Sequence, residues 1–519
     1  MNESFGHLCR LLRGCASYIF VVVGHTCKSI RRGESSDRTA TPGYRRDHAP
    51  SDTETLRIRR WRPTVGPALF LLDALLAGTT WPFAAALAVQ HLPPQGQPGL
   101  VPLLLYPATY LVFLYALGLY RRDALTEARR SLGRAPLAAG FGGLVASAAV
   151  ALLPPPLGGP GSPILFAIAV PCFTAAGFTA RAIVFALQRR GAFRRRLLVI
   201  GAGRRAWDLV WLLRKEGRTP VYDIAIVHDP AMGEVDPRLA TDPANHILPA
   251  AAGFLAAAQR FRADQVVVAP DERRGMAMRD LLACRTAGFP VAEYLGFLEN
   301  EIGRVDLKRL ELGWLLYADG FAAGPLDHVL KRALDIGVSL AVLLLTSPIL
   351  LAAAAVVKLG DGGPVLYRQE RVTRGGRVFR IMKLRTMRVD AERAGAVWAA
   401  ERDPRVTRAG RLLRRSRIDE LPQLFNVLNG DMSFVGPRPE RPEFTRELAT
   451  KLPLYNERHL VRAGLTGWAQ VNYPYGASLD DARSKLSYDL YYVKNAGVLF
   501  DLLIILQTFR VVLWPSGVR

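Results

Sequence analysis

Cysteine is scarce in this 519-residue chain, and its spacing gives no sign of cross-linking or metal binding. The five cysteines are scattered, with no Cys-x-x-Cys pair among them: Cys9, Cys15, Cys27, Cys172 and Cys284. Disulfide frameworks and structural zinc sites both need regularly spaced thiols. The sequence therefore indicates neither of them.

Acidic residues are also scarce, compared with the basic residues. Asp and Glu number 45 against 68 Lys and Arg, a formal net charge of +23, and 50% of the residues are hydrophobic. Such a chain is too apolar for an ordinary soluble enzyme and long enough for several domains. In a chain with membrane segments, the positive excess favours cytoplasmic loops, anionic lipid head groups and phosphorylated substrates over nucleic acid.

The first sixty residues lack a convincing signal peptide. The apolar run at 18–23 is too short to cross a bilayer, and no small-residue cleavage site closes it. The residues after this run are basic and polar up to Arg62. We interpret residues 1–62 as a disordered cytoplasmic extension.

Two of the next loops lack Lys and Arg altogether. Four apolar stretches are each long enough for a transmembrane helix: residues 64–91, 99–120, 135–153 and 163–187. The loops at 91–98 and 154–163 carry no basic residue, whereas the other flanks are rich in arginine. This alternation predicts a four-helix transmembrane bundle, residues 63–190, with both ends in the cytoplasm. Buried helices of a large soluble domain would not produce so regular a pattern.

Residues 191–323 have a β-α-β rhythm. Apolar runs at 197–200, 224–227 and 265–269 predict strands, and residues 207–215 predict a helix. The turn Gly201-Ala202-Gly203 stands where a nucleotide phosphate approaches a helix N-terminus in dinucleotide-binding folds. The stretch lacks the length of a full fold of that kind. A working nucleotide site and a vestigial or regulatory Rossmann-like module both stay open.

An apolar run at 331–358 is interrupted by Ser347-Pro348. Proline removes an intrahelical hydrogen bond, so the helix should break or kink there, and the serine can bond the freed backbone groups. Lys331, Arg332 and Lys358 flank the run, and the remainder of the chain is rich in arginine, which disfavours a crossing. We predict a re-entrant helical hairpin with Lys331 and Arg332 as membrane-interface anchors. A single straight span with a proline kink is the alternative.

Two adjacent carboxylates, Asp419 and Glu420, stand between a basic run and a short apolar helix predicted to begin near Pro422. Carboxylates at the positive end of a helix, among arginines, stay ionised and suit a divalent metal and a phosphate. The plainer interpretation is that Asp419 caps the helix and Glu420 pairs with an arginine.

Basic side chains beside rigid turns accompany this pair. Arg438 lies between two prolines, whose stiff backbone predicts a preorganised guanidinium for a phosphate. The other candidates for phosphate contact are Lys383, Arg385, Arg368, Arg417 and Arg462. Any one of them could be a solvated surface residue. Their number near an acidic pair favours a phosphotransfer site.

Six motifs, in this order, resemble the bacterial sugar transferase family, the monotopic polyprenyl-phosphate glycosyl-1-phosphate transferases. They are Lys331-Arg332, Ser347-Pro348, Lys383-Leu384-Arg385-Thr386-Met387, Asp419-Glu420-Leu421-Pro422-Gln423-Leu424, Gly436-Pro437-Arg438-Pro439 and Gly464-Leu465-Thr466-Gly467-Trp468. The resemblance covers residue 326 to the C-terminus and implies an α/β monotopic catalytic domain, residues 324–519. The bundle and the Rossmann-like α/β middle domain look like the long form of the family, and the tract at 293–321 is similar to its exopolysaccharide branch.

The resemblance implies a chemistry. A UDP-sugar gives its sugar-1-phosphate to undecaprenyl phosphate or another polyprenyl phosphate, UMP is released, and the reaction passes through a phosphosugar-enzyme intermediate. It implies Asp419 as the nucleophile, Asp419 and Glu420 as ligands of Mg²⁺, and Arg438 as a ligand of the transferred phosphate. It also implies the bacterial inner membrane, membrane lipids as partners and an active site facing the cytoplasm. Homodimerisation stays open.

Two other classes of function stay open. A nucleotide-sugar-modifying oxidoreductase would use the Gly201-Ala202-Gly203 turn, although no Tyr-x-x-x-Lys with an upstream serine supports it. A non-catalytic scaffold for polysaccharide assembly would need neither metal nor the acidic pair. The apolar stretch at 498–514 fits the membrane interface and core packing equally well.

Overall fold

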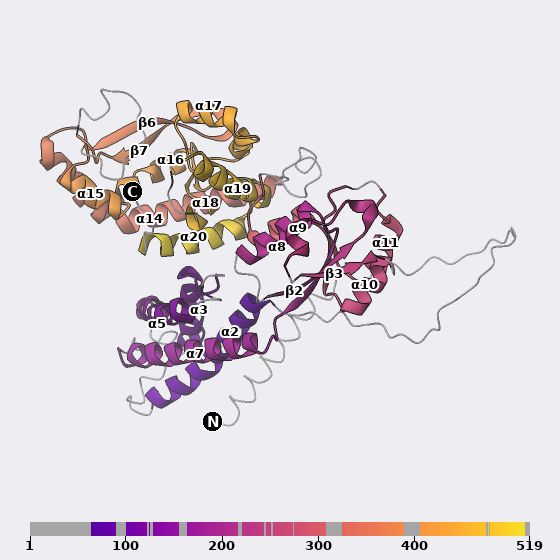
Figure 1. The fold of residues 1–519 in the computed structure, drawn as a ribbon. Coiled ribbons are helices and arrows are strands. Elements are labelled where there is room, and N and C mark those ends of the chain that lie inside the picture. Colours follow the sequence, from indigo (N-terminus) through magenta and orange to yellow (C-terminus); the bar gives the residue numbers. More distant parts are fainter. Residues whose placement is uncertain are drawn as a thin grey trace, which may run out of the picture. The chain divides into compact units, whose positions relative to one another are not determined.

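The computed structural model describes residues 64–89, 100–121, 124, 128–154, 163–215, 221–242, 245–250, 253–272, 275–307, 324–388, 405–473, 476 and 478–513 (Figure 1). The predicted basic extension lies outside the described residues, as do the loop at 91–98, most of the loop at 154–163 and the second half of the tract at 293–321.

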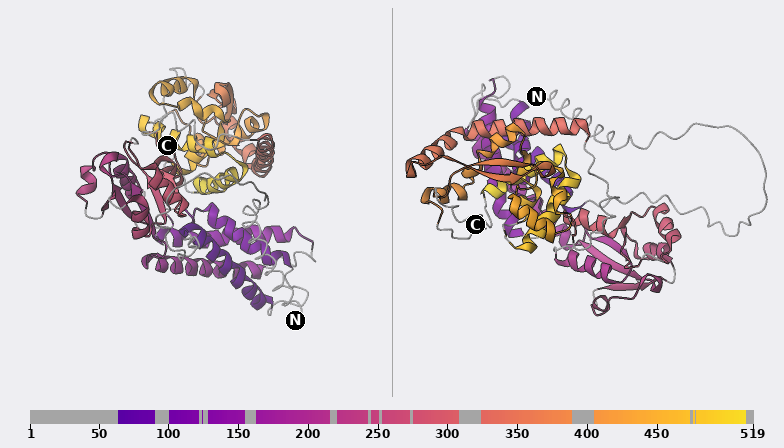
Figure 2. Two further views of the ribbon diagram at one scale, coloured as in Figure 1. Left: turned by 90° about the vertical axis from the view of Figure 1, so that its right-hand side faces the viewer. Right: turned by 90° about the horizontal axis from the view of Figure 1, so that it is seen from above.

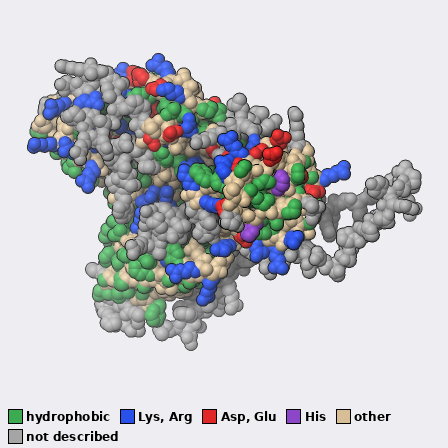
Figure 3. Space-filling view, in the orientation of Figure 1, with side chains coloured by type: hydrophobic (Ala, Val, Ile, Leu, Met, Phe, Trp, Pro, Cys, Tyr) green, Lys and Arg blue, Asp and Glu red, His purple; other side chains and the backbone are tan. Residues whose placement is uncertain are grey.

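Four apolar helices follow one another after residue 64, as predicted. They are α2 (Val65–Val89), α3 (Leu100–Ala116), α5 (Ala128–Ala151) and α7 (Pro163–Arg189). By length and composition, α2, α5 and α7 can each cross a membrane. With 17 residues, α3 is about 26 Å long, slightly less than a hydrocarbon core of about 30 Å. Hydrophobic side chains cover most of the visible surface of these helices (Figure 3), which suits contact with lipid.

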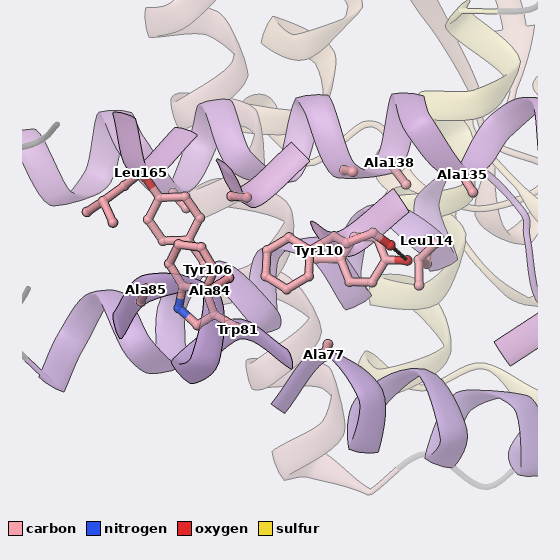
Figure 4. Packing of buried hydrophobic residues seen from close by; sticks show 14 of the residues in the cluster. Ala77, Trp81, Ala84, Ala85, Tyr106, Tyr110, Leu114, Ala135, Ala138 and Leu165 are labelled. Atoms are coloured by element: carbon pink, nitrogen blue, oxygen red, sulfur yellow. Dashed lines mark hydrogen bonds between the residues drawn. The ribbon is translucent and has the colours of Figure 1, made fainter. Parts of the chain in front are cut away.

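Aromatic rings fill the interior of the bundle (Figure 4). Trp81 stacks on Tyr106 at 4.6 Å, and Tyr110 stacks on Phe173 at 4.8 Å. The polar atoms of these rings are bonded, since Tyr110 donates to the Phe173 carbonyl at 2.9 Å and Trp81 to the Pro102 carbonyl at 3.2 Å. A bilayer offers no water to replace such bonds, so they fix how the helices pack.

An ion pair also lies inside the bundle. Arg181 of α7 meets Asp73 of α2 at 3.0 Å, and both side chains are almost fully buried. The Tyr120 hydroxyl donates to the same carboxylate at 2.9 Å. Pairing makes these charges tolerable in an apolar setting and ties α2 to α7 at one register.

The middle domain is a parallel sheet with helices on both faces, in agreement with the predicted β-α-β rhythm. Its strands are β1 (Arg195–Ile200), β2 (Tyr222–His228), β3 (His246–Pro249), β4 (Gln265–Val268) and β5 (Val291–Glu293), in the order β3-β2-β1-β4-β5. Its main helices are α8 (Arg204–Lys215), α10 (Gly253–Phe261), α11 (Met278–Thr286) and α12 (Tyr294–Ile302). Alternate residues of β1 face opposite ways, so that Leu197 and Val199 pack with α8 and α12, and Leu198 and Ile200 with α10 and α11.

The turn between β1 and α8 holds a carboxylate of the chain itself. The two oxygens of Asp271 accept hydrogen bonds from the backbone nitrogens of Arg204, at 2.7 Å, and Arg205, at 2.9 Å. Gly203 lies against this carboxylate so closely that a Cβ would overlap it. Asp271 therefore takes the position at the helix start where dinucleotide-binding folds hold a phosphate.

The C-terminal domain, which we call the catalytic domain after the function that the resemblance implies, combines one long helix, a β-hairpin and a cluster of shorter helices. Its elements are α14 (Pro325–Asp361), β6 (Leu366–Val372), β7 (Val378–Leu384), α15 (Arg408–Arg415), η5 (Ile418–Glu420), α16 (Gln423–Asn429), β8 (Ser433–Val435), α17 (Pro442–Lys451), η6 (Tyr455–Leu460), β9 (Gly464–Thr466), α18 (Trp468–Asn472), α19 (Leu479–Asn495) and α20 (Val498–Leu513). A turn at Gly375-Gly376 joins β6 to β7 in a hairpin, and the predicted helix after Pro422 is present.

The helix α14 does not divide at Ser347-Pro348, where the sequence predicts a break or a kink. It continues through Pro348 as one 37-residue helix, the long ribbon in the right-hand view of Figure 2. Pro348 cannot bond the Leu344 carbonyl four residues earlier, and the Ser347 hydroxyl donates to that carbonyl at 2.8 Å instead. The serine thus satisfies the freed group, as expected, but the predicted re-entrant hairpin is not confirmed.

Both halves of α14 pack against the same catalytic domain. In the first half, Asp335 accepts bonds from Ser433 and from the Phe434 nitrogen, each at 2.9 Å. In the second half, Ala353 and Val357 pack into the catalytic core with Leu384 and Leu413. The opposite side of the helix is apolar and exposed, and includes Leu340, Leu344, Leu345, Ile349, Leu351, Val356 and Leu359.

The predicted membrane anchors Lys331 and Arg332 contact protein. Lys331 meets Asp501 of α20 at 2.5 Å and the Val435 carbonyl at 3.2 Å. Arg332 donates to the carbonyls of Val427 and Leu428 at the end of α16, each at 2.6 Å. Both side chains therefore fasten α14 to the domain that follows it.

The segment after α12 belongs to the core of the catalytic domain. Val305 is 3% exposed and packs with Leu448, Leu452, Tyr455, Leu486 and Leu490. The Val305 nitrogen donates to the Ser487 carbonyl at 3.1 Å, and the Trp468 indole to the Gly303 carbonyl at 2.7 Å. We therefore propose that the catalytic domain begins at about residue 303, directly after α12, and not at 324.

Val305→Ala should destabilise the catalytic domain by about 2 kcal/mol, because it leaves a cavity among five large side chains. The melting temperature of the purified full-length protein should fall by about 5 °C. Val329→Ala is the matched control, since Val329 is 65% exposed on α14. Equal melting temperatures for the two variants would show that Val305 is not part of this core.

Candidate active site

The acidic pair lies in a single 3-10 turn, η5, between α15 and α16. Arg417, directly before it, has a left-handed backbone with φ of 59°, which is unfavourable for a side chain of this size. The helix α16 has Pro422 at its N-cap and no side-chain cap bond, so Asp419 does not cap it. This excludes the plainer interpretation of Asp419.

Three basic groups converge on Glu420. Its Oε1 lies 3.1 Å from Lys383 Nζ and 3.0 Å from Arg438 Nη2, and its Oε2 lies 3.5 Å from Arg417 Nη1. The Glu420 side chain is 12% exposed. The pairing with arginine expected for Glu420 is therefore present, as part of a cluster with Lys383 and Arg438.

The two carboxyl groups have opposite electrostatic environments. Burial, together with the neighbouring Glu420, raises the pKa of Asp419 to about 6, against the opposing effect of Lys383. Burial alone would raise the pKa of Glu420 too, but Lys383, Arg438 and Arg417 outweigh it and hold that pKa well below its usual value. Glu420 is thus a fixed negative charge, and Asp419 is an unusually basic carboxylate that is still largely ionised at neutral pH.

A cavity of about 670 Å³ opens in front of this pair. Four of the predicted phosphate ligands line it: Lys383, Arg385, Arg417 and Arg438. Arg385 also fixes the cavity wall, since its Nε donates to the Pro364 carbonyl at 2.7 Å. The site therefore combines a carboxylate of raised pKa with several positive charges in a space large enough for a substrate.

Two predicted ligands lie elsewhere. Arg368 is exposed and does not line the cavity, whereas Gln369 and Arg371 of the same strand do. Arg462 is also outside the cavity lining and lies among the charges of Arg332 and Asp335. The geometry gives no support to a phosphate contact by either residue.

Several cavity residues are absent from the sequence-based candidates. They include Arg371, Arg388, Arg405, Arg414, Arg441, Arg458 and Lys485. The hairpin register could have revealed Arg371, because Tyr367 pairs with Lys383 and Arg371 pairs with Phe379 on the same face. Arg414 donates to the Thr386 hydroxyl at 2.9 Å, a contact between distant segments that carries no local signal.

The glycines after Arg462 serve backbone packing. A Cβ on Gly464 would overlap the Gly436 nitrogen, and one on Gly467 would overlap the Gly436 carbonyl oxygen. The parallel pairing of β8 with β9 brings these backbones together. The motif at 464–468 therefore packs against the backbone of the segment that carries Arg438.

Comparison with known proteins identifies the family. The model of the family described as "Bacterial sugar transferase" matches residues 326–515. An "Exopolysaccharide production protein PSS" from Rhizobium leguminosarum bv. phaseoli is 42% identical over 192 residues, which are 35% of this chain and 94% of that protein. The chain belongs to the bacterial sugar transferase family. This confirms the resemblance drawn from the six motifs.

Longer relatives match over part of their length. A "UDP-N-acetylgalactosamine-undecaprenyl-phosphate N-acetylgalactosaminephosphotransferase" from Aeromonas hydrophila is 42% identical over 265 residues, 50% of this chain and 61% of that protein. A "UDP-glucose:undecaprenyl-phosphate glucose-1-phosphate transferase" from Escherichia coli K12 is 40% identical over 184 residues, 35% of this chain and 40% of that protein. The chain thus spans 61% of the first of these relatives and 40% of the second.

Asp419→Asn should raise the melting temperature by about 2–6 °C at pH 7.5, in the presence of a chelator. The raised pKa means that the folded state binds the Asp419 proton more tightly than the unfolded state does, so ionisation of Asp419 destabilises the fold as the pH rises from about 4 to about 6. The gain should shrink to about half at pH 5. Asp480→Asn, at an exposed position of α19, should give no gain. A lower melting temperature of Asp419→Asn at pH 7.5 would contradict the electrostatic assignment.

Proposed function

We propose that this sugar transferase moves a sugar-1-phosphate from a UDP-sugar to undecaprenyl phosphate, giving undecaprenyl diphosphosugar and UMP. The observation that carries this proposal is the pairing of two unlike carboxylates in one cavity. Asp419 is basic and has an open face, since no described residue donates a hydrogen bond to it, and Glu420 is held as a fixed charge among three cations. Acyl-phosphate chemistry needs a nucleophile of this kind.

The reaction would proceed in two displacements. An Asp419 oxygen attacks the phosphorus that carries the sugar, the bond from this phosphorus to the UMP oxygen breaks, and UMP leaves with the electron pair. An oxygen of the lipid phosphate then attacks the same phosphorus and expels the Asp419 carboxylate. Each step exchanges one P–O bond for another, and Asp419 ends as it began.

The basic residues would neutralise the diphosphate. Arg438 and Lys383 both lie within 3.1 Å of Glu420 and line the cavity, so both are near a phosphate bound beside Asp419. Their charges would counter the negative charge that otherwise repels an attacking carboxylate, and would stabilise the transition state. Glu420 would orient them by its three ionic contacts.

Asp419 and Glu420 are also the residues that would hold Mg²⁺. Among the described residues no group of three acidic, histidine or cysteine side chains could hold a metal by itself. Two carboxylates with hard oxygen donors still suit Mg²⁺, which proteins commonly bind through one or two carboxylates and substrate phosphates. When bound, the ion would neutralise the diphosphate and polarise its oxygens.

The contacts of α14 support a site on the cytoplasmic side of the membrane. By length and composition α14 could cross a membrane, but both of its halves pack on the catalytic domain, which favours a helix that lies along the membrane surface. The apolar outer side would lie in the membrane, and both ends would stay in the cytoplasm, where nucleotide sugars are made. The bacterial inner membrane, with its undecaprenyl phosphate, is the matching location.

The alternative functions receive less support. In the middle domain, Asp271 takes the phosphate position that an oxidoreductase would need for its cofactor. A scaffold would have no use for a basic carboxylate facing a cavity. The names of the relatives include both N-acetylgalactosamine and glucose transferases.

Purified protein should release UMP continuously from at least one UDP-sugar only when undecaprenyl phosphate and Mg²⁺ are present, and without the lipid phosphate it should release at most one UMP per active site. Asp419→Asn should lower this rate by at least about 10³-fold, because the amide cannot displace UMP, and Glu420→Gln by about 10²-fold. Arg368→Met should stay within about twofold of the parent, since Arg368 is outside the cavity. UMP release by Asp419→Asn at the parental rate would remove the nucleophile assignment. A parent protein inactive on every donor would refute the function.

A reporter fused to the C-terminus should read cytoplasmic. Green fluorescent protein should fluoresce there and alkaline phosphatase should be inactive, because both ends of α14 lie on one side. A reporter inserted in the arginine-free loop at 91–98 is the control and should read periplasmic. Alkaline phosphatase activity at the C-terminus would mean that α14 crosses the bilayer.

A further inference from the structure

The backbone around Arg438 is held at four successive carbonyls. Pro437 accepts from the Gly464 nitrogen at 2.8 Å, and Glu440 from the Val372 nitrogen at 3.0 Å. Between them, Arg438 accepts from Arg458 Nη2 at 2.9 Å, and Pro439 from Arg371 Nη1 at 3.2 Å. We call residues 436–440 the arginine strap.

Arg458 reaches the strap from a buried network. Its Nη1 donates to the Tyr455 hydroxyl at 2.7 Å, and its Nη2 lies 2.8 Å from Asp489 Oδ2. Arg458 is 5% exposed and Asp489 is 3% exposed. A guanidinium so deeply buried needs a counter-ion, and Asp489, in the middle of α19, supplies it.

The position of this ion pair is informative. A buried pair gives little net stability, and apolar side chains of similar size would often pack as well. Here, however, Arg458 donates to the main-chain carbonyl of Arg438, and the Arg438 side chain lies 3.0 Å from Glu420. A change at Asp489 would therefore alter the aim of the Arg438 guanidinium.

We propose that Arg458, held by Asp489, is the positioning residue that aims Arg438 at the transferred phosphate. The inference rests on the proposed function. It gives α19 a role in the reaction, because Asp489 of this helix acts on the substrate only through Arg458 and Arg438. Arg458 and Asp489 both line the cavity, but the two terminal nitrogens of Arg458 already have partners within the protein.

A double-mutant cycle on the full-length protein tests this inference. Asp489→Asn should lower kcat/KM for the UDP-sugar by about 10- to 100-fold per folded molecule, since a small misplacement of a catalytic group has effects of this size. In an Arg438→Lys background the same change should lower kcat/KM by less than about twofold, because the group that it aims is already altered. Losses that multiply in the double variant would overturn the inference.

Lys494→Met is the matched control for damage to α19. Lys494 lies on the same helix and forms a buried ion pair with Glu299 at 2.8 Å, away from the strap. It should lower the melting temperature as Asp489→Asn does, yet keep kcat/KM within about twofold of the parent. A loss of activity equal to that of Asp489→Asn would mean that any disturbance of α19 suffices, which also overturns the inference.

Two further safeguards complete the test. If Asp489→Asn does not fold, Arg458→Lys replaces it in the same cycle, because lysine keeps the buried charge and loses the second donor. The parent protein must first release UMP. If it does not, the proposed function fails, and if it does, the cycle judges the positioning role alone.

Discussion

The charge balance around Glu420 underlies the organisation of the catalytic domain. Lys383 comes from a hairpin, Arg438 from a loop between β8 and α17, and Arg417 from the turn before η5, and all three meet one carboxylate. Cations brought together in this way would repel one another without Glu420. Their shared attraction to it keeps them packed, and burial together with the charge of Glu420 raises the pKa of Asp419. One glutamate thus links the assembly of the site to the reactivity of its neighbour.

Much of this arrangement can be predicted from the sequence, because the signals are local. The four apolar helices, the strands of the middle domain, the hairpin at Gly375-Gly376 and the acidic pair before a proline-capped helix all depend on residues close together in the chain. The basic residues that line the cavity were only partly predictable. Arg368 and Arg371 lie in one strand, and because side chains alternate along a strand, only one of the two arginines can face the cavity. The pairing of Tyr367 with Lys383 was needed to decide which of the two it is.

Other features could not be read locally. Pro348 predicts a break, but the Ser347 hydroxyl and the packing of both halves of α14 keep the helix continuous. Val305 looks like part of a linker, and only the fold shows that five side chains from α17, η6 and α19, or next to them, enclose it. Arg458 has no motif around it, and its importance lies in a contact with a carbonyl twenty residues earlier. Such long-range contacts decide these cases, and sequence patterns do not record them.

The glycines within the arginine strap and packed against it limit how this enzyme can evolve. A methyl group at Gly436, Gly464 or Gly467 would force two backbones apart, so mutation at these positions moves Arg438 whatever the new residue is. Leu479, on another part of the cavity wall, is 41% exposed. A substitution of Leu479 would change the shape of the cavity without changing the residues around Asp419. A chain built in this way can diversify its choice of sugar by drift at the cavity wall while selection keeps the transfer step unchanged.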